Sequence, residues 1–312
     1  MNLLHNLKTD LISFFEKNNK DFTLDCIPPL PKPPQNYKET FAQRKNRQLR
    51  HEVNYLLERY INILRRQFSF QKPKNVFISK ELQEKITNNI LSKDICSTID
   101  KIKIELEAGI DISSRLSKLI KKFDYDDKML NDWNIYHFHL SDIDDIKSGF
   151  KKRTGELLFV YVPFNSDNVY FLDVSKEHKD KTTFCNRNLL DLINKNWSEL
   201  LASFTLPDGM KPYPYSIKTN EEYLNLREAN INTIIPLNNT DKYILSPGFG
   251  QTAAGTSTYN KIQTNKIIRT IQLLIKEKIS PENIPVKLIL KDNYIFIKNL
   301  KENNFLCKIS II

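Results

Sequence analysis

The sequence is poor in glycine, and it lacks both long apolar runs and clustered cysteines. Only seven of its 312 residues are glycine, so any glycine-rich stretch stands out. No apolar run approaches the roughly 18 residues that cross a bilayer, and residues 1–8 lack the apolar core of a signal peptide. We therefore expect a cytoplasmic protein that does not contact membranes.

The four cysteines are isolated along the chain. Cys26, Cys96, Cys185 and Cys307 form no CxxC pair and no zinc-ligand spacing. Cysteines of this kind are usually reduced thiols, mostly buried, in a reducing compartment. The sequence therefore predicts neither a disulfide scaffold nor a structural zinc site, and we expect no cofactor.

Positive charge is in excess. The chain has 47 Lys and Arg against 37 Asp and Glu, which gives a net charge of +10. Between Lys38 and Lys74, ten basic residues face three acidic ones, so this segment carries +7. A basic excess is typical of proteins that bind RNA or DNA. The alternative is a chain that is basic because of its general richness in Lys, Asn and Ile.

The same segment contains the strongest helix signal in the chain. Residues 38–68 place apolar side chains at helical spacing, with Arg and Lys on the opposite side. Such a basic side can contact phosphates, or it can simply be the solvated face of a helix in a bundle. The candidate nucleic-acid-binding residues here are Arg44, Lys45, Arg47, Arg50, Arg65 and Arg66.

The patterns along the chain predict an α+β fold with three consecutive regions. Residues 1–130 are expected to be mostly helical, with helices at 2–19, 38–68, 80–91 and 93–107. Five prolines between residues 28 and 34 predict an extended connector. Residues 131–205 are expected to form a small antiparallel sheet with a flanking helix, and residues 206–312 a second small α+β unit.

Three of the five histidines fall within residues 133–178, in blocks that are typical of antiparallel strands. His137 and His139 are two residues apart, so they should share one face of a strand. Arg153 is expected to begin the next strand and His178 to follow the third. A surface with histidine and arginine can bind phosphate and exchange protons near neutral pH.

This order of strands resembles the RelE-like ribonuclease toxins. In that pattern helices precede a strand, a basic strand begins with Arg-x-Gly, and a third strand ends in a basic or histidine-containing turn. The pattern corresponds here to residues 135–140, 153–162 and 169–178, within about 50 of the 312 residues. The long helical front and the C-terminal unit are additions to that pattern. The resemblance implies metal-independent RNA cleavage in a toxin or in antiviral defence, with an inhibitory antitoxin as a partner.

The residue types in this region fit RNA cleavage. The reaction needs a base, an acid and a cation that stabilises charge on phosphorus. Histidine serves either proton role, and arginine binds phosphate through two donors. Tyrosines can stack on bases. The residues that we assign to catalysis are His137, His139, Arg153 and His178. Those that we assign to RNA binding in this region are Tyr136, Tyr161 and Lys179.

The leading hypothesis is therefore an endoribonuclease, and two alternatives stay open. In the first, the same basic residues position nucleic acid without catalysis. In the second, His137 and His139 bind a metal ion in a metal-dependent enzyme. The further metal ligands would come from Asp142, Asp144, Asp173 and His178. The oligomeric state cannot be derived from the sequence.

Three of the seven glycines, Gly248, Gly250 and Gly255, lie within eight residues. The loop is expected between a strand and a helix, where backbone N–H groups can hold a phosphate of the nucleic acid. Its spacing matches neither the dinucleotide-binding fingerprint nor a Walker A motif. The alternative is a tight turn that requires positive φ angles.

Overall fold

The computed structural model divides the chain into two units, each assembled from separate stretches of sequence. Unit 1 comprises Met1–Arg66, Lys121–Tyr125 and Asn260–Ile312, and unit 2 comprises Gln67–Ile120 and Asp126–Tyr259. The predicted α+β class is confirmed, but the three consecutive regions are not, because residues 1–130 contribute to both units. The structure describes residues 3–19, 21–33, 35, 38–67, 70–176, 180–210, 217–238, 240–279 and 284–311.

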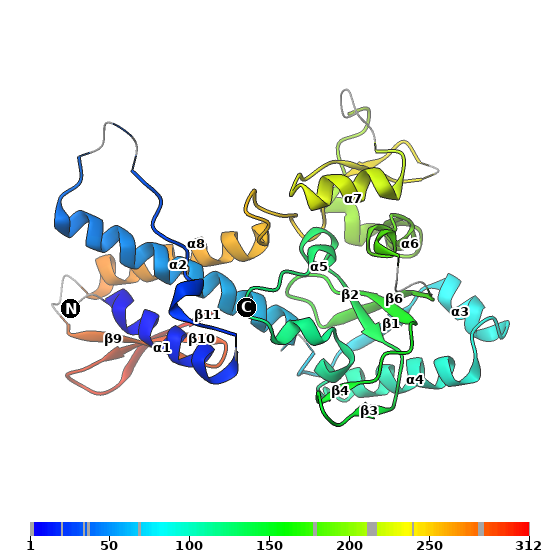
Figure 1. Ribbon diagram of the computed structural model, residues 1–312, viewed down its shortest axis with the longest axis horizontal. Helices are drawn as coiled ribbons and strands as arrows, with labels where there is room; N and C mark the ends of the chain where they lie inside the picture. Colours follow the sequence, from blue (N-terminus) through cyan, green and yellow to red (C-terminus); the bar gives the residue numbers. More distant parts are fainter. Residues whose placement is uncertain are drawn as a thin grey trace. The chain divides into compact units, whose positions relative to one another are not determined.

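A four-stranded sheet forms the centre of unit 2, with its strands in the order β1-β6-β5-β2 (Figure 1). The strands β2 (Ile135–His139), β5 (Leu157–Tyr161) and β6 (Asn168–Ser175) are antiparallel neighbours, as predicted. The additional strand β1 (Asn75–Ile78) runs parallel to β6, so the whole sheet is mixed. Two short pairs of strands complete unit 2: β3 (Asp144–Asp145) with β4 (Phe150–Lys151), and β7 (Ile235–Pro236) with β8 (Tyr243–Ile244).

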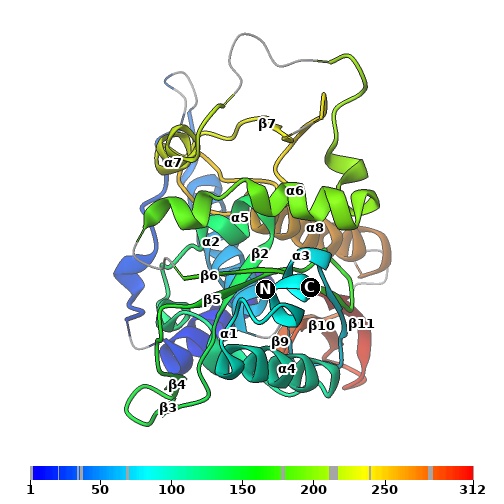
Figure 2. The ribbon, with the colours of Figure 1, turned by 90° about the vertical axis from the view of Figure 1, so that its right-hand side faces the viewer.

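Helices cover both faces of this sheet. On one face lie α3 (Lys80–Thr87) and α4 (Lys93–Glu107), and on the other lie α5 (Lys128–Trp133) and α6 (Asn188–Asn196) (Figure 1 and Figure 2). Beside α5 and α6, α7 (Asn220–Glu228) contributes to the same hydrophobic cluster. The two faces therefore have separate hydrophobic cores.

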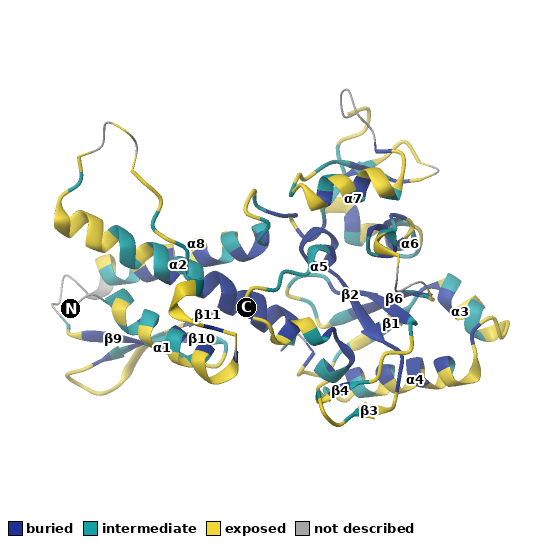
Figure 3. Cartoon of the chain, viewed as in Figure 1, coloured by how far each residue is buried: buried dark blue, intermediate teal, exposed yellow. Residues whose placement is uncertain are grey.

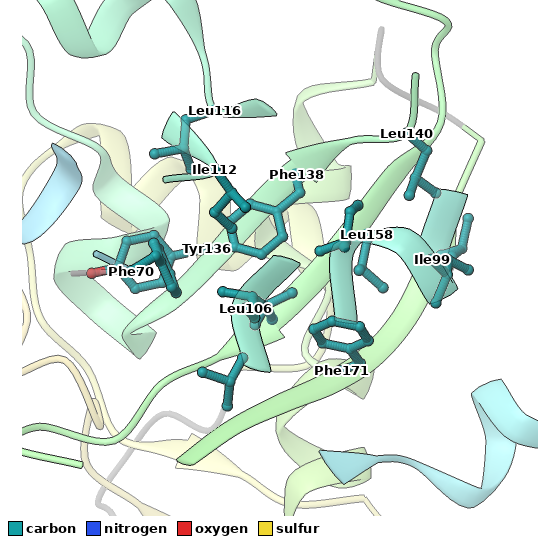
Figure 4. Close-up of a cluster of buried hydrophobic side chains, with 14 of the residues drawn as sticks. Phe70, Ile99, Leu106, Ile112, Leu116, Tyr136, Phe138, Leu140, Leu158 and Phe171 are labelled. Atoms are coloured by element: carbon teal, nitrogen blue, oxygen red, sulfur yellow. The ribbon is translucent and has the colours of Figure 1, made fainter. Parts of the chain in front are cut away.

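Alternate residues of β2 enter these two cores, as strand geometry requires. Tyr136 and Phe138 belong to the cluster on the side of α3 and α4 (Figure 4). Ile135 belongs to the cluster on the other side, with Trp133. All five residues of β2 are buried, so this strand has no face exposed to solvent.

Unit 1 combines helices with a three-stranded antiparallel sheet in the order β11-β10-β9. The helices are α1 (Leu3–Asn18), α2 (Phe41–Gln67) and α8 (Thr258–Leu274), of which α8 begins in unit 2. The strands are β9 (Val286–Lys291), β10 (Tyr294–Asn299) and β11 (Phe305–Ser310). The Asp10 carboxylate on α1 accepts a hydrogen bond of 2.9 Å from the Leu290 N–H. Helix α1 therefore satisfies a backbone donor on the outer edge of β9.

Most predicted helices agree with the structure, and α8 is followed by a π-helical turn at Ile275–Ile279. The flanking helix expected within residues 131–205 is α6, and it is followed by a 3₁₀ segment at Ser198–Phe204. Shorter 3₁₀ turns occur at Leu24–Cys26, Ser113–Arg115, Lys118–Lys121 and Lys181–Cys185. Within the part of the chain that is described, no helix has both the length and the apolar character needed to span a membrane.

We expect Ser79→Ala to destabilise the protein more than Ser92→Ala. The buried Ser79 hydroxyl accepts a hydrogen bond from Leu82 N (3.1 Å) at the start of α3, and it donates one to Leu172 O (2.6 Å) on β6. The exposed Ser92 hydroxyl caps α4 through Ile95 N. Loss of both hydrogen bonds in Ser79→Ala should lower the free energy of unfolding by about 1–3 kcal/mol. Loss of the exposed cap in Ser92→Ala should lower it by about 1 kcal/mol. Urea unfolding followed by circular dichroism measures both, and equal losses would contradict a role for the bond to β6.

Candidate functional site

His137 and His139 share one face of β2, but that face is buried. The two residues are 7% and 2% exposed. The His137 ring centroid lies 5.1 Å from that of Phe184 and 6.3 Å from that of His139. The Asp127 carboxylate lies near His137, with its Oδ2 3.8 Å from Nδ1. The expected histidine surface is therefore an internal layer of unit 2, because helices and loops pack over it.

Arg153 lies in an exposed loop and does not begin a strand. The strand β5 begins four residues later, at Leu157. The strand register pairs Leu157 with both His139 and Ser175, so the Arg153 loop enters the sheet at the end where β2 finishes. His178 and Lys179, which were assigned to catalysis and RNA binding, lie outside the described residues. The structure therefore brings Arg153 and His139 to the same end of the sheet, one on the surface and one in the core.

The two tyrosines assigned to base stacking belong to the hydrophobic cores. Tyr136 is 6% exposed, and its ring centroid lies 4.9 Å from that of Phe70. Tyr161 is 2% exposed and belongs to the opposite cluster, where burial raises its pKa above the usual value. Their burial contradicts the expected stacking role, because a nucleic-acid base cannot reach either ring.

The carboxylates proposed as metal ligands are paired with cations instead. Asp142 accepts a hydrogen bond of 2.8 Å from Arg115 Nη2. Burial acts to raise the pKa of Asp142, but Arg115 and Lys101 together outweigh it, and the pKa is lowered. Asp173 forms an ion pair with Lys85 at 2.7 Å. The described ranges contain no group of three or more His, Cys, Asp and Glu that could hold a metal ion. The geometry therefore gives the metal alternative no ligand set there.

A buried ion pair on the same side of the sheet was missed by the sequence analysis. Asp132 on α5 and Arg227 on α7 are each 3% exposed, and Arg227 Nε donates to Asp132 Oδ2 at 2.6 Å. The same oxygen accepts a hydrogen bond from Tyr223 (3.1 Å), and Oδ1 accepts one from Gln251 (3.3 Å). The guanidinium lies 4.6 Å above the Trp133 ring. The contact could not be predicted from the sequence, because residues 132 and 227 are far apart in the chain and belong to no motif.

The ion pair is connected to the histidine layer through residues 184 and 185. Arg227 donates hydrogen bonds to the carbonyl of Phe184 and to Cys185 Sγ, the latter at 3.2 Å. The Phe184 ring contacts His137. Burial raises the pKa of the Cys185 thiol, so this sulfur is protonated at neutral pH and is a poor nucleophile. We interpret the whole group as a polar network that holds α5, α7 and the Phe184 turn together.

The glycine loop is packed against α5. Gly248 N donates to Asp132 O at 2.7 Å, and Gly250 N donates to Asn131 O at 3.0 Å. A Cβ atom on Gly248 would lie 2.4 Å from Asn131 O, so no larger residue fits. Gly250 and Gly255 have positive φ angles, as the tight-turn alternative requires, and Gly255 N donates to Thr252 O. Because these N–H groups are already engaged, the loop does not offer them to a phosphate.

The basic helix α2 is exposed along its first half and buried along its second (Figure 3). Arg44, Lys45 and Arg50 are exposed, whereas Arg47 is held by the Glu39 carboxylate at 2.8 Å. Near the other end, Arg65 donates to Asn260 Oδ1, and Arg66 donates to the carbonyl oxygen of Asn62. These last two arginines are 5% and 2% exposed, which contradicts their expected contact with phosphate.

A pocket of about 500 Å³ lies in unit 1 between α1 and the exposed half of α2. An ion pair of 2.6 Å between Lys8 and Glu52 crosses its lining. The lining of the pocket therefore carries charges of both signs, and it also includes the basic residues Lys45 and His5. Its complete lining is His5, Asn6, Lys8, Lys45, Asn46, Gln48, Leu49 and Glu52.

The net positive charge of the chain comes from unit 1. Unit 1 has 24 Lys and Arg against 12 Asp and Glu, a net charge of +12. Unit 2 has 23 against 25, a net charge of −2. A general basic bias of composition would raise both units alike, so it does not explain this separation.

Comparisons with protein-family models, with curated proteins and with solved structures found no match to this chain. The resemblance to RelE-like toxins therefore stays a prediction. The function has to be argued from the chemistry of the described residues.

We expect Arg227→Met to lower the free energy of unfolding by about 3–5 kcal/mol, because it leaves the Asp132 carboxylate buried without its cation. The control is Lys181→Met, which removes the exposed ion pair between Lys181 and Glu228 (3.5 Å). That control should lose at most about 1 kcal/mol. Urea unfolding curves of the two variants and the wild type measure the difference. Overlapping curves for Arg227→Met and the wild type would contradict a structural role for the buried pair.

Proposed function

We propose that this protein binds nucleic acid and that unit 1 provides the binding surface. The observation that carries the proposal is the +12 net charge of unit 1 beside a nearly neutral unit 2. Nucleic acids carry a condensed layer of counterions, and lysines and arginines that contact phosphates release these ions. A unit with a large positive surplus gains binding free energy by this route.

The exposed half of α2 supports the proposal at the level of residues. Arg44, Lys45 and Arg50 are exposed, whereas the carboxylates of Glu39 and Glu52 are paired with Arg47 and Lys8. The hydrogen bond from Arg47 is the largest cause that lowers the pKa of Glu39, so this carboxylate stays ionised and paired. The three exposed cations are therefore available for phosphate contacts.

Binding without catalysis is favoured over the endoribonuclease hypothesis by the burial of the histidine layer. A general base must come within hydrogen-bond reach of the proton that it removes. His139, at 2% exposure, has no surface through which an RNA 2′-hydroxyl can approach. Phosphate contact on unit 1 needs no such access.

We expect the triple variant Arg44→Gln, Lys45→Gln and Arg50→Gln to bind a duplex more weakly and with less dependence on salt. Each lost phosphate contact should reduce the slope of log K against log salt by about 0.9. The loss should be nearly the same for different sequences, because phosphate contacts carry no base information. Fluorescence anisotropy of a labelled duplex at several NaCl concentrations measures both quantities.

The matched control removes three exposed lysines from unit 2, through Lys93→Gln, Lys152→Gln and Lys218→Gln. This control changes the net charge of the chain by the same amount as the α2 triple variant. It should leave the salt slope close to that of the wild type. Identical slopes for the two triple variants would reject α2 as a binding surface.

The endoribonuclease remains a second candidate because of one observation. The strand register brings the end of β2, the loop before β5 and the end of β6 to one end of the sheet. These segments contain His139 and Arg153, whereas His178 lies outside the described residues. The Thr154 hydroxyl donates a hydrogen bond of 2.9 Å to Leu140 O and so anchors the loop. The backbone next to Arg153 is therefore held in place, while the Arg153 side chain is exposed.

If this end of the sheet cleaves RNA, Arg153→Ala should lower the rate by about 10²–10³, the usual effect of losing one preorganised donor. Arg153→Lys should recover part of the rate, because lysine cannot make the two-donor contact. The melting temperature should not change, since Arg153 is exposed. Cleavage of end-labelled RNA in EDTA, with Lys152→Ala as the neighbouring control, is the measurement. Absence of cleavage by the wild type would eliminate this candidate and leave the binding proposal intact.

A further inference from the structure

The outer face of the unit 1 sheet presents aromatic rings and lysines in one array. Buried residues alternate with partly exposed ones along β10, where Ile295 and Ile297 are buried and Tyr294 and Phe296 are half-buried. Tyr294 and Phe296 therefore share the side of the sheet that faces away from the core. On the neighbouring strand β11, Phe305 is 60% exposed.

The strand register fixes the neighbours on this face. Across the three strands the rows are Lys287, Lys298 and Phe305; then Ile289, Phe296 and Lys308; then Lys291, Tyr294 and Ser310. The ring centroids of Phe296 and Phe305 are 5.1 Å apart, and those of Tyr294 and Phe296 are 6.1 Å apart. Lys308 Nζ lies 3.5 Å from the Tyr294 ring centroid. We call these nine residues the aromatic-lysine face.

The charges on the aromatic-lysine face are of one sign. It has four lysines and no acidic residue, and the nearest carboxylates in sequence, Asp292 and Glu302, lie in the two turns. Lys287 and Lys298 are directly opposite each other on neighbouring strands. Like charges in this position destabilise a sheet. The stability of the sheet therefore does not explain this arrangement, whereas attraction of a polyanion does.

We propose that the aromatic-lysine face binds single-stranded nucleic acid. This inference rests on the proposed function and specifies its substrate. Bases that are not paired can stack on Tyr294, Phe296 and Phe305, as every base has a flat π-face. The lysines around the rings contact the phosphates that connect those bases.

The combination of rings and lysines favours a single strand over a duplex. In a duplex the bases are already stacked on one another, so exposed aromatic rings gain nothing from them. A row of lysines alone would serve either form. The three aromatic side chains on one face of the sheet therefore distinguish it from the exposed half of α2, whose candidate binding residues are all basic.

The test compares the full-length chain with Phe296→Ala, and with Phe296→Tyr, which keeps a ring. Binding is measured by anisotropy with a labelled oligo-uridine and oligo-thymidine of about 15 nucleotides and with a duplex of the same length. Phe296→Ala should weaken single-strand binding about 5- to 150-fold, the range for losing one base stack. Its duplex binding should change by less than about twofold, since the lysines remain. The control is Phe77→Ala, which removes an aromatic residue of unit 2 that is 41% exposed.

A second pair of variants tests the same face even if Phe296→Ala does not fold. Lys298→Gln and Lys308→Gln change exposed or half-exposed charges, and each should reduce the salt slope for oligo-uridine by roughly 0.7. Equal affinity for oligo-uridine and oligo-thymidine would assign the face to single strands of either sugar, and a large difference would assign it to the tighter one.

The remaining outcomes overturn the inference in distinguishable ways. Single-strand binding that survives Phe296→Ala and both lysine variants would reject the aromatic-lysine face and leave the nucleic-acid proposal standing on α2. Failure of every oligonucleotide and duplex to bind would reject both proposals. Capture by anionic lipid vesicles, together with no binding of oligonucleotides, would assign the face to a lipid surface instead.

Discussion

Burial of both faces of the four-stranded sheet is the constraint on which the functional argument depends. Helices α3 and α4 cover one face, and α5 and α6 cover the other, so every side chain of β2 enters a core. A pair of histidines that would be a reactive surface on an open sheet becomes an internal polar layer, beside Phe184 and Asp127. Unit 2 has nearly balanced charges, and the surplus of positive charge lies in unit 1.

The local signals in the sequence predicted much of this fold. The helices α1, α2, α3 and α4 were expected from the sequence pattern, because apolar periodicity depends on neighbours within one or two turns. The alternation of β2 placed His137 and His139 on one face correctly. It could not tell whether that face was covered, because the covering residues, such as Phe184, are distant in sequence.

The features that the sequence did not reveal depend on long-range contacts. Asp132 and Arg227 look like ordinary charged residues until the fold buries them against each other. Gly248 suggested phosphate binding, yet it is glycine because the backbone of α5 passes 2.4 Å from where a Cβ would be. Arg65 and Arg66 continue the basic pattern of α2 but are buried. Charge pattern alone cannot separate such residues from exposed ones like Arg44.

If unit 1 binds nucleic acid as proposed, the distribution of charge is a balance between stability and binding. A net +12 within unit 1 destabilises its folded state through self-repulsion, and the opposed Lys287 and Lys298 add a local contribution. Folding alone gives no reason to keep these lysines on one side of a sheet whose other side is well packed. A polyanion that binds only the folded state relieves the repulsion and stabilises the unit in proportion to its occupancy. On the proposed function, the same residues that weaken unit 1 in isolation become favourable when a nucleic acid is bound.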